Sequence, residues 1–278
     1  MSEPEPPPAP PPGWSATGTP LPRFPDDQQT VVLEEEPAAT GIWDRFPPVT
    51  PMDSALLILV WGALFLASRG LPPDADASLV PWGANVAPWR DGALGVWRLL
   101  ASTALHATPL HLLSNTIAMA LLGPGCARLF GRAGFWVLFA TGGLAASLAS
   151  VWWRSQTSLV TSASVGASGA IFAIGGAILA LAWRLRHELP PGRARALGGA
   201  MMILLAQGLI SGMTRQATDN AAHLGGLVAG VLLGRVLPAR EPEAPPASRV
   251  VRLAAAAGVA TLGLSLGLAI VSGLASTR

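Results

Sequence analysis

The sequence predicts an all-α polytopic membrane protein with a six-helix core and one additional C-terminal transmembrane helix. Of its 278 residues, 51% are hydrophobic and only 12% are charged. Soluble domains carry about 25% charged residues, so half that proportion, concentrated outside long apolar runs, indicates several membrane spans. The single cysteine, Cys126, lies in an apolar stretch and excludes an intrachain disulfide.

Residues 1–48 differ in composition from the rest of the chain. They contain the proline-rich run PPAPPPG and an acidic cluster at residues 34–36. Such a segment buries too little apolar surface to offset its ordering entropy, so we expect a disordered cytoplasmic tail. It lacks the apolar stretch of a cleaved signal peptide, and we expect the first span to act as an uncleaved signal.

Seven apolar stretches approach the length of about 20 residues that a helix needs to cross a bilayer. They lie near residues 52–69, 108–128, 134–153, 166–184, 195–213, 220–237 and 253–274. The first six form a predicted core over residues 50–237. Residues 238–252 are a proline-containing linker, and we interpret the seventh helix, 253–274, as an appendage to that core.

The distribution of arginines predicts the orientation of these spans, because cytoplasmic loops of membrane proteins are enriched in basic residues. The chain has no lysine, and a cytoplasmic N-terminus would place twelve arginines inside and six outside. We therefore expect a cytoplasmic N-terminus and a C-terminus on the outer side. The protein is expected to be an integral multi-pass protein of a bacterial inner membrane. The second, fourth and sixth spans would begin at the outer side.

A long loop, residues 70–107, joins the first two spans and contains Trp82, Trp89 and Trp97. Tryptophan is enriched at membrane–water interfaces. We expect this loop to lie partly within the outer interface.

Four polar residues fall within the first turns of the spans that begin at the outer side. His111 and Asn115 lie on the second span, Ser168 begins the fourth, and His223 lies on the sixth. Polar groups at membrane depth are costly and indicate a functional site. Because these four share one depth, we expect them to form one site that opens to the outer side.

Their chemistry suits acyl transfer. Ser168, at a helix N-terminus between the small residues Gly166 and Gly169, would be the nucleophile, and His223 its general base. His111 and Asn115 are one helical turn apart and could donate hydrogen bonds to an oxyanion. No carboxylate is spaced to orient the histidine, so the sequence predicts a Ser–His dyad.

Each feature also has a structural interpretation. Gly226, Gly230 and Gly234 form successive GxxxG steps, which typically serve close helix packing. Ser168 alone is more often a packing residue, and a lone buried His223 can be a satisfied core histidine. A metal site is disfavoured because the histidines share no helical face and no carboxylate joins them. We expect no metal and no cofactor.

Three motifs resemble those of the rhomboid intramembrane serine proteases. They are WRLLASTALHATPLHLLSN, GASG and AHLGGLVAG, which follow one another in this order within residues 50–237. Any one of them is weak evidence. All three in order, at matching spans and depth, are specific.

The resemblance implies that Ser168 and His223 hydrolyse peptide bonds in or near transmembrane segments of other proteins. It also implies an oxyanion hole formed by the Ser168 main-chain N–H, His111 and Asn115. Supporting roles would fall to other residues: close approach of two spans at Gly226 and Gly230, anchoring of the outer loop by Trp97 and Arg98, and a structural histidine at His106.

Two positions depart from the family pattern. Phe172 stands where the family often has a tyrosine that stacks on the catalytic histidine, so the ring is kept and the hydroxyl is lost. Ala127 stands where a glutamate often lies. We expect this departure to affect local stability more than chemistry.

The predicted partners are transmembrane protein substrates and the lipid bilayer, with no nucleic acid. We expect a water-containing polar cavity and lateral arrival of substrate from the lipid. Two alternatives remain: an inactive relative that binds or chaperones membrane proteins, and a transporter. The clustering of polar groups near one side and the absence of broken spans disfavour the transporter. The oligomeric state is not predicted.

Overall fold

The computed structural model describes residues 51–69, 79–86, 92–157, 163–188, 192–214, 219–240 and 247–276. All of them belong to one compact unit, residues 41–278. The described residues are mostly helical, as the sequence predicts. The expected disordered tail, residues 1–48, lies outside the described residues, and Trp89 of the long loop does as well.

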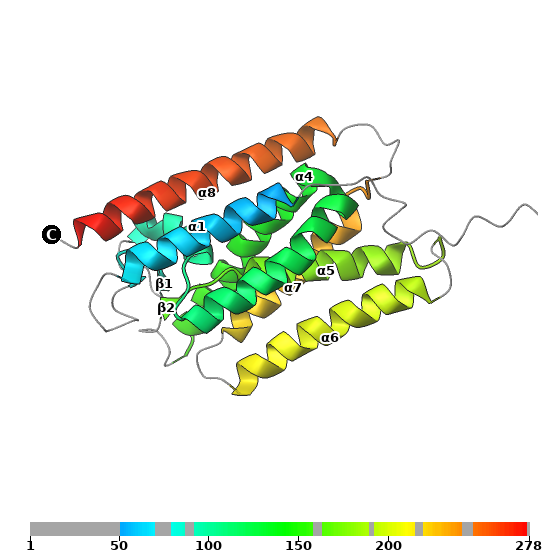
Figure 1. The fold of residues 1–278 in the computed structure, drawn as a ribbon, viewed down its shortest axis with the longest axis horizontal. Coiled ribbons are helices and arrows are strands. Elements are labelled where there is room, and N and C mark those ends of the chain that lie inside the picture. Colours follow the sequence, from blue (N-terminus) through cyan, green and yellow to red (C-terminus); the bar gives the residue numbers. More distant parts are fainter. Residues whose placement is uncertain are drawn as a thin grey trace, which may run out of the picture. The chain divides into compact units, whose positions relative to one another are not determined.

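Long helices form most of the described structure (Figure 1). They are α1 (Met52–Arg69), α4 (Pro109–Ser155), α5 (Ser168–Arg184), α6 (Arg193–Thr214), α7 (Asn220–Val236) and α8 (Arg249–Ala275). Among the described residues, α4 and α8 are long and apolar enough to cross a membrane by themselves. Apolar helices of 10–17 residues lie within the other four. The helix bounds fall within a few residues of the expected stretches.

The second and third expected spans are the two halves of α4. Gly131, with φ 74° and ψ 168°, breaks the helix between them. Only glycine adopts such a conformation readily. The second half folds back toward the segment that precedes the first, where the Ser147 hydroxyl donates to the Leu99 carbonyl at 2.6 Å. A single glycine thus replaces the loop that hydropathy predicts.

The segment between α1 and α4 contains short ordered elements. They are the strand β1 (Asn85–Val86), the 3₁₀ helix η2 (Gly92–Trp97), the helix α3 (Arg98–Ala101) and the 3₁₀ helix η3 (Ser102–Ala104). β1 pairs antiparallel with β2 (Ala163–Ser164), with Asn85 opposite Ser164. This small sheet ties the segment to the residues that lead into α5.

α5 and α7 pack backbone against backbone. A Cβ at Gly226 would lie 2.0 Å from the Gly169 carbonyl oxygen, and one at Gly230 would lie 2.0 Å from that of Ala173. Gly234 continues the contact one turn further on. Small residues allow this proximity between membrane helices. It brings the first turns of both helices close together.

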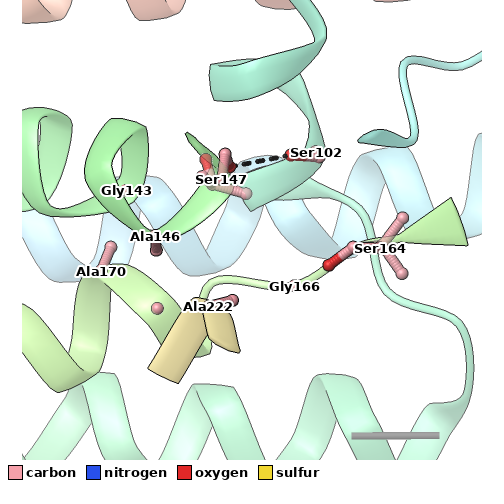
Figure 2. Close-up of a pocket in the computed structure, with 11 residues that line it drawn as sticks. Ser102, Gly143, Ala146, Ser147, Ser164, Gly166, Ala170 and Ala222 are labelled. Atoms are coloured by element: carbon pink, nitrogen blue, oxygen red, sulfur yellow. Dashed lines mark hydrogen bonds between the residues drawn. The ribbon is translucent and has the colours of Figure 1, made fainter. Parts of the chain in front are cut away.

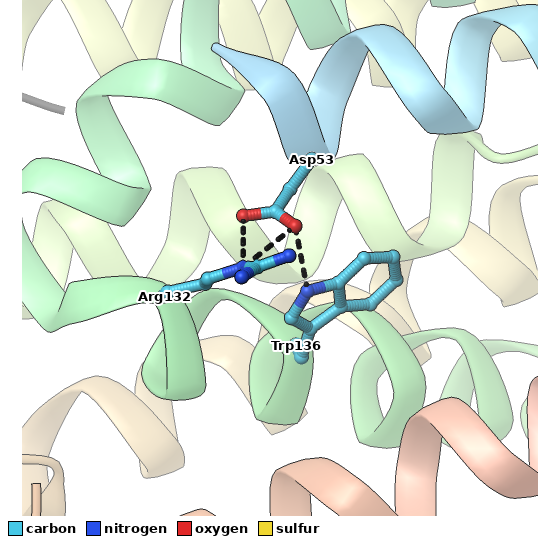
Figure 3. Close-up of polar contacts among 3 residues, drawn as sticks. All are labelled: Asp53, Arg132 and Trp136. Carbon is cyan, nitrogen blue, oxygen red and sulfur yellow. Dashed lines mark hydrogen bonds and ion pairs between the residues drawn. The ribbon is translucent and has the colours of Figure 1, made fainter. Parts of the chain in front are cut away.

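At the other end of these helices, a polar cluster joins α1 to α4 (Figure 3). Arg132 Nε donates to the two carboxylate oxygens of Asp53 at 2.9 and 2.8 Å, and Trp136 Nε1 donates at 3.2 Å. Asp53 is buried, whereas the Arg132 side chain is largely exposed. The cluster fixes the start of α1 beside the turn at Gly131.

Candidate active site

Ser168 and His223 lie within hydrogen-bonding distance at the N-termini of α5 and α7. Ser168 Oγ is 2.9 Å from His223 Nε2. His223 is buried, and Ser168 is half-buried. Since the first N–H groups of a helix have no intrahelical partner, the start of α5 also offers backbone donors and a positive dipole end beside the hydroxyl.

Phe172 fixes the plane of the imidazole. Its ring stacks on that of His223 with centroids 4.2 Å apart and an interplanar angle of 5°. On the side of α6, a Cβ at Gly208 would lie 2.6 Å from Phe172 Cζ. The aromatic ring is therefore held between His223 and the backbone of α6.

His111 and Asn115 lie beside the backbone that precedes Ser168. Gly166 has φ +123°, and a Cβ there would be 2.6 Å from the His111 ring and 3.5 Å from Asn115 Nδ2. Thr108 caps α4 by accepting from the His111 N–H at 3.1 Å, which sets the start of this helix. Asn115 Nδ2 is buried and has no hydrogen-bond partner within the described part of the chain. A buried amide donor without a partner is costly, which is typical of a group that binds a ligand.

The carboxylate nearest in sequence to His223 belongs to Asp219, which caps α7. It accepts from the Ala222 N–H at 3.0 Å and from the Ser150 hydroxyl. His223 Nδ1 is buried and makes no hydrogen bond to any residue that the structure describes. Within the described part of the chain, Ser168 and His223 thus form a hydrogen-bonded pair, and no carboxylate accepts from the histidine.

A small polar pocket is lined by residues on both sides of Ser168 in the chain, Gly166 and Gly169 among them (Figure 2). The hydroxyls of Ser102 and Ser147 approach within 3.5 Å of each other at its wall. The Ser102 carbonyl accepts from the Gly166 N–H at 2.9 Å. The pocket has room for about one water molecule, and its polar lining suits one.

The residues expected to anchor the outer loop make direct contacts. Arg98 is buried, donates to the Val80 carbonyl and lies 4.6 Å from the centre of the Trp97 ring. His106 packs against Trp61, with ring centroids 5.3 Å apart. Burial, together with the nearby His111, lowers the pKa of His106 to about 3. His106 is therefore neutral at neutral pH.

The structure contains a buried polar network, formed by Asn85, Ser147 and Arg154, that the sequence does not predict. Asn85 Nδ2 donates to the Ser147 carbonyl at 3.0 Å, and Arg154 Nη2 donates to the Asn85 carbonyl at 2.6 Å. This network joins β1 to the second half of α4. In the sequence, Arg154 looks like any other arginine next to the end of a span. What distinguishes Arg154 is its burial, which the sequence does not reveal.

The remaining expected residues are also placed by the structure. Gly169 lies against α4, where its Cβ would be 2.3 Å from Ala146 Cβ. Ala127 and Cys126 are buried on α4. Among the described residues, no group of three His, Cys, Asp or Glu side chains is arranged to hold a metal ion.

The apolar helices and the polar residues gathered at their ends define a helical membrane protein built around a Ser–His hydrogen bond. Residues 93–240 match the Rhomboid domain family, which is 148 of the 278 residues and thus just over half of the chain. The chain belongs to the rhomboid family. This family is membrane-embedded, in agreement with α4 and α8, which among the described residues are long and apolar enough to span a membrane.

Several curated proteins are similar to this chain. The chain is 29% identical to rhomboid protease AarA of Providencia stuartii over 57% of its own length and 61% of the relative's. It is 31% identical to rhomboid protease GluP of Bacillus subtilis (strain 168), over 51% of this chain and 26% of that protein. The match to the putative rhomboid protease YdcA of the same organism is 30% identical, over 68% of this chain and 88% of the relative. The chain thus spans less than two thirds of AarA and GluP.

Proposed function

We propose that this protein is an intramembrane serine protease that hydrolyses peptide bonds in or near transmembrane segments of other membrane proteins. The observation that carries the proposal is the 2.9 Å contact between Ser168 Oγ and His223 Nε2 at the start of two membrane helices. The names of the relatives as rhomboid proteases support the same activity.

In the proposed reaction, His223 Nε2 takes the proton of Ser168 as Oγ attacks the peptide carbonyl carbon. The imidazolium then gives this proton to the leaving amine as the C–N bond breaks, which leaves an acyl ester on the serine. Water attacks the ester while His223 again accepts a proton. Breakdown of the second tetrahedral intermediate releases the acid and restores the serine.

The oxyanion of each tetrahedral intermediate would accept hydrogen bonds from the Ser168 main-chain N–H, His111 and Asn115. The unpartnered Asn115 Nδ2 beside Gly166 supports this assignment. Loss of one such donor costs about 3 kcal/mol in comparable sites. We therefore expect Asn115→Ala to slow the reaction about a hundredfold without abolishing it.

The pocket lined by Gly166 and Gly169, which flank Ser168 in the chain, would supply the hydrolytic water. Its serine hydroxyls and the nearby Gly166 backbone could hold a water close to the acyl ester. A site within membrane helices needs such a source, because the surrounding lipid contains almost no water.

We further propose that the N-terminus is cytoplasmic and that the Ser168 end opens to the outer side of a bacterial inner membrane. Exposed arginines at the opposite end, among them Arg186, Arg235 and Arg240, support this orientation. A Ser276→Cys variant in a Cys126→Ala background tests it. Labelling in spheroplasts by a membrane-impermeant maleimide is expected, and labelling only after lysis would reverse the orientation.

The activity is tested without knowledge of the substrate. The full-length protein in detergent is treated with a fluorophosphonate probe, alongside Ser168→Ala and His223→Ala. We expect strong labelling of the wild type that both substitutions abolish. An unlabelled wild type that elutes as a folded monodisperse species would instead favour the non-catalytic relative that binds membrane proteins.

A further inference from the structure

α8 contributes no residue to the proposed site, but its C-terminal turns contact the segment that leads there. Its buried face consists mostly of small residues, at Ala255, Leu262, Ser265, Ala269 and Gly273. Through this face it packs on α4, α3 and η2. A Cβ at Gly273 would lie 2.4, 2.6 and 2.7 Å from three atoms of the Trp82 indole. The helix backbone therefore lies directly against the indole ring.

Trp82 is buried within a hydrogen-bonded turn, residues 79–86. The Gly83 N–H donates to the Val80 carbonyl at 3.1 Å, and the Ala84 N–H donates to the Leu79 carbonyl at 3.0 Å. The indole is 2% exposed. A rigid ring enclosed in this way cannot move without moving its turn.

The same turn continues into β1, which pairs with β2. Asn85 lies opposite Ser164, and Ser164 is four residues before Ser168. Between them, the Gly166 N–H donates to the Ser102 carbonyl at 2.9 Å. A continuous series of contacts thus runs from the end of α8 to the backbone that presents the nucleophile.

We infer that Trp82 and Gly273 are positioning residues: α8 holds the 79–86 turn and, through the β1–β2 pair, sets the backbone of residues 164–168. The inference rests on the proposed function, because its readout is the reactivity of Ser168. A helix that served only as a membrane anchor would need no glycine against a buried indole. Two other glycines of α8, Gly263 and Gly267, have nothing within 4 Å of an added Cβ.

These glycines provide matched controls on the same helix. Gly273→Ala, Gly263→Ala and Gly267→Ala are purified as full-length proteins, and the rate constant of fluorophosphonate labelling is measured with the melting temperature. Alanine favours a helix over glycine, so the two controls should be at least as stable as the wild type and label within twofold of its rate. Gly273→Ala should label at least fivefold more slowly, because its methyl group displaces Trp82.

Complementation separates positioning from a general loss of stability. Trp82→Phe removes part of the ring that the new Cβ would meet, so the double variant Trp82→Phe/Gly273→Ala should label faster than Gly273→Ala alone. If Gly273→Ala does not fold, the single variant Trp82→Phe tests the inference instead. It loosens the contact from the other side and should slow labelling at least threefold.

An unchanged labelling rate in folded Gly273→Ala would overturn the inference. If Gly273→Ala does not fold, an unchanged rate in Trp82→Phe would overturn it. A lower melting temperature with an unchanged rate would do the same, because it would limit α8 to a structural role. In both cases the proposed function survives, since the wild type is labelled and Ser168→Ala is not. An unlabelled wild type would instead contradict the proposed function itself.

Discussion

Gly166 joins three parts of the site at a single residue. Its N–H donates to the Ser102 carbonyl, and the face where a side chain would be is occupied by His111 and Asn115. Its φ of +123° lies in a region that other residues rarely adopt. The backbone before Ser168 thus depends on the absence of a side chain.

Gly166→Ala should slow fluorophosphonate labelling at least tenfold. The variant combines an unfavourable positive φ, which costs about 1–3 kcal/mol, with a Cβ 2.6 Å from the His111 ring. Gly192→Ala is the matched control, since Gly192 has φ +95° but nothing within 4 Å. Equal labelling rates for the two variants would show that the contact with His111 is unimportant.

At the scale of elements, the α5–α7 pair carries both members of the proposed dyad. Backbone contacts at Gly226 and Gly230 set the distance between the helices. At the far end, Arg184 of α5 donates to the carbonyls of Gly234, Arg235 and Leu237. The pair is therefore fixed at both ends.

Gly226→Ala should lower the melting temperature and abolish detectable labelling. Its Cβ would lie 2.0 Å from the Gly169 carbonyl oxygen, and a backbone atom cannot move aside as a flexible side chain can. The helices must separate, which breaks the contact between Ser168 and His223. Gly199→Ala, where an added Cβ meets nothing within 4 Å, should leave both measurements near those of the wild type.

α6 contacts the site through Phe172. Gly208→Ala would place a Cβ 2.6 Å from Phe172 Cζ, so either the ring tilts away from His223 or α6 moves outward. A tilted ring would slow labelling several-fold at an unchanged melting temperature. We expect this result, with Gly199→Ala as control. An unchanged labelling rate would mean that α6 moves and the stack on His223 is kept.

The sequence predicts the helices better than the connections. Apolar stretches near 52–69 and 220–237 correspond closely to α1 and α7, because lipid-facing and core-facing side chains are both apolar. Hydropathy cannot indicate that Gly131 alone joins the halves of α4. The pairing of Asn85 with Ser164 joins residues 79 positions apart and has no periodic signal.

The same distinction holds for the site. His111, Asn115, Ser168 and His223 can be identified from the sequence because polar residues are rare at membrane depth. The Asn85–Arg154 network cannot be identified in this way. Both residues lie outside the predicted spans, where polar residues are common, and they meet only after folding. The assignment of catalytic roles to the four residues remains a prediction.

For the molecule as a whole, the Asp53 cluster and the proposed site lie at opposite ends of the helices. Removing the cluster should therefore change stability and leave chemistry intact. Arg132→Gln leaves the buried Asp53 carboxylate without its ion pair, whereas Asp53→Asn leaves a largely exposed arginine that water can solvate. We expect Arg132→Gln to lower the melting temperature more than Asp53→Asn.

Both variants, once folded, should label with fluorophosphonate at the rate of the wild type. Water can solvate the largely exposed Arg132 once its partner is neutral, and the oxygen of the new amide can still accept from Trp136, so only a modest fall of the melting temperature is expected for Asp53→Asn. A slower labelling rate in either variant would indicate that the two ends of the protein are coupled.

The contrast between the glycines of α7 and those of α8 has a consequence for mutational tolerance. Gly226, Gly230 and Gly234 each abut backbone atoms, whereas Gly263 and Gly267 have open space around them. In a saturation screen for functional variants, substitutions at these three positions, which are four residues apart along α7, should therefore not be tolerated. α8 should accept almost any apolar side chain at Gly263 and Gly267 and become restrictive at Gly258, where an added Cβ would lie 2.8 Å from Ala140 Cβ, and at Gly273.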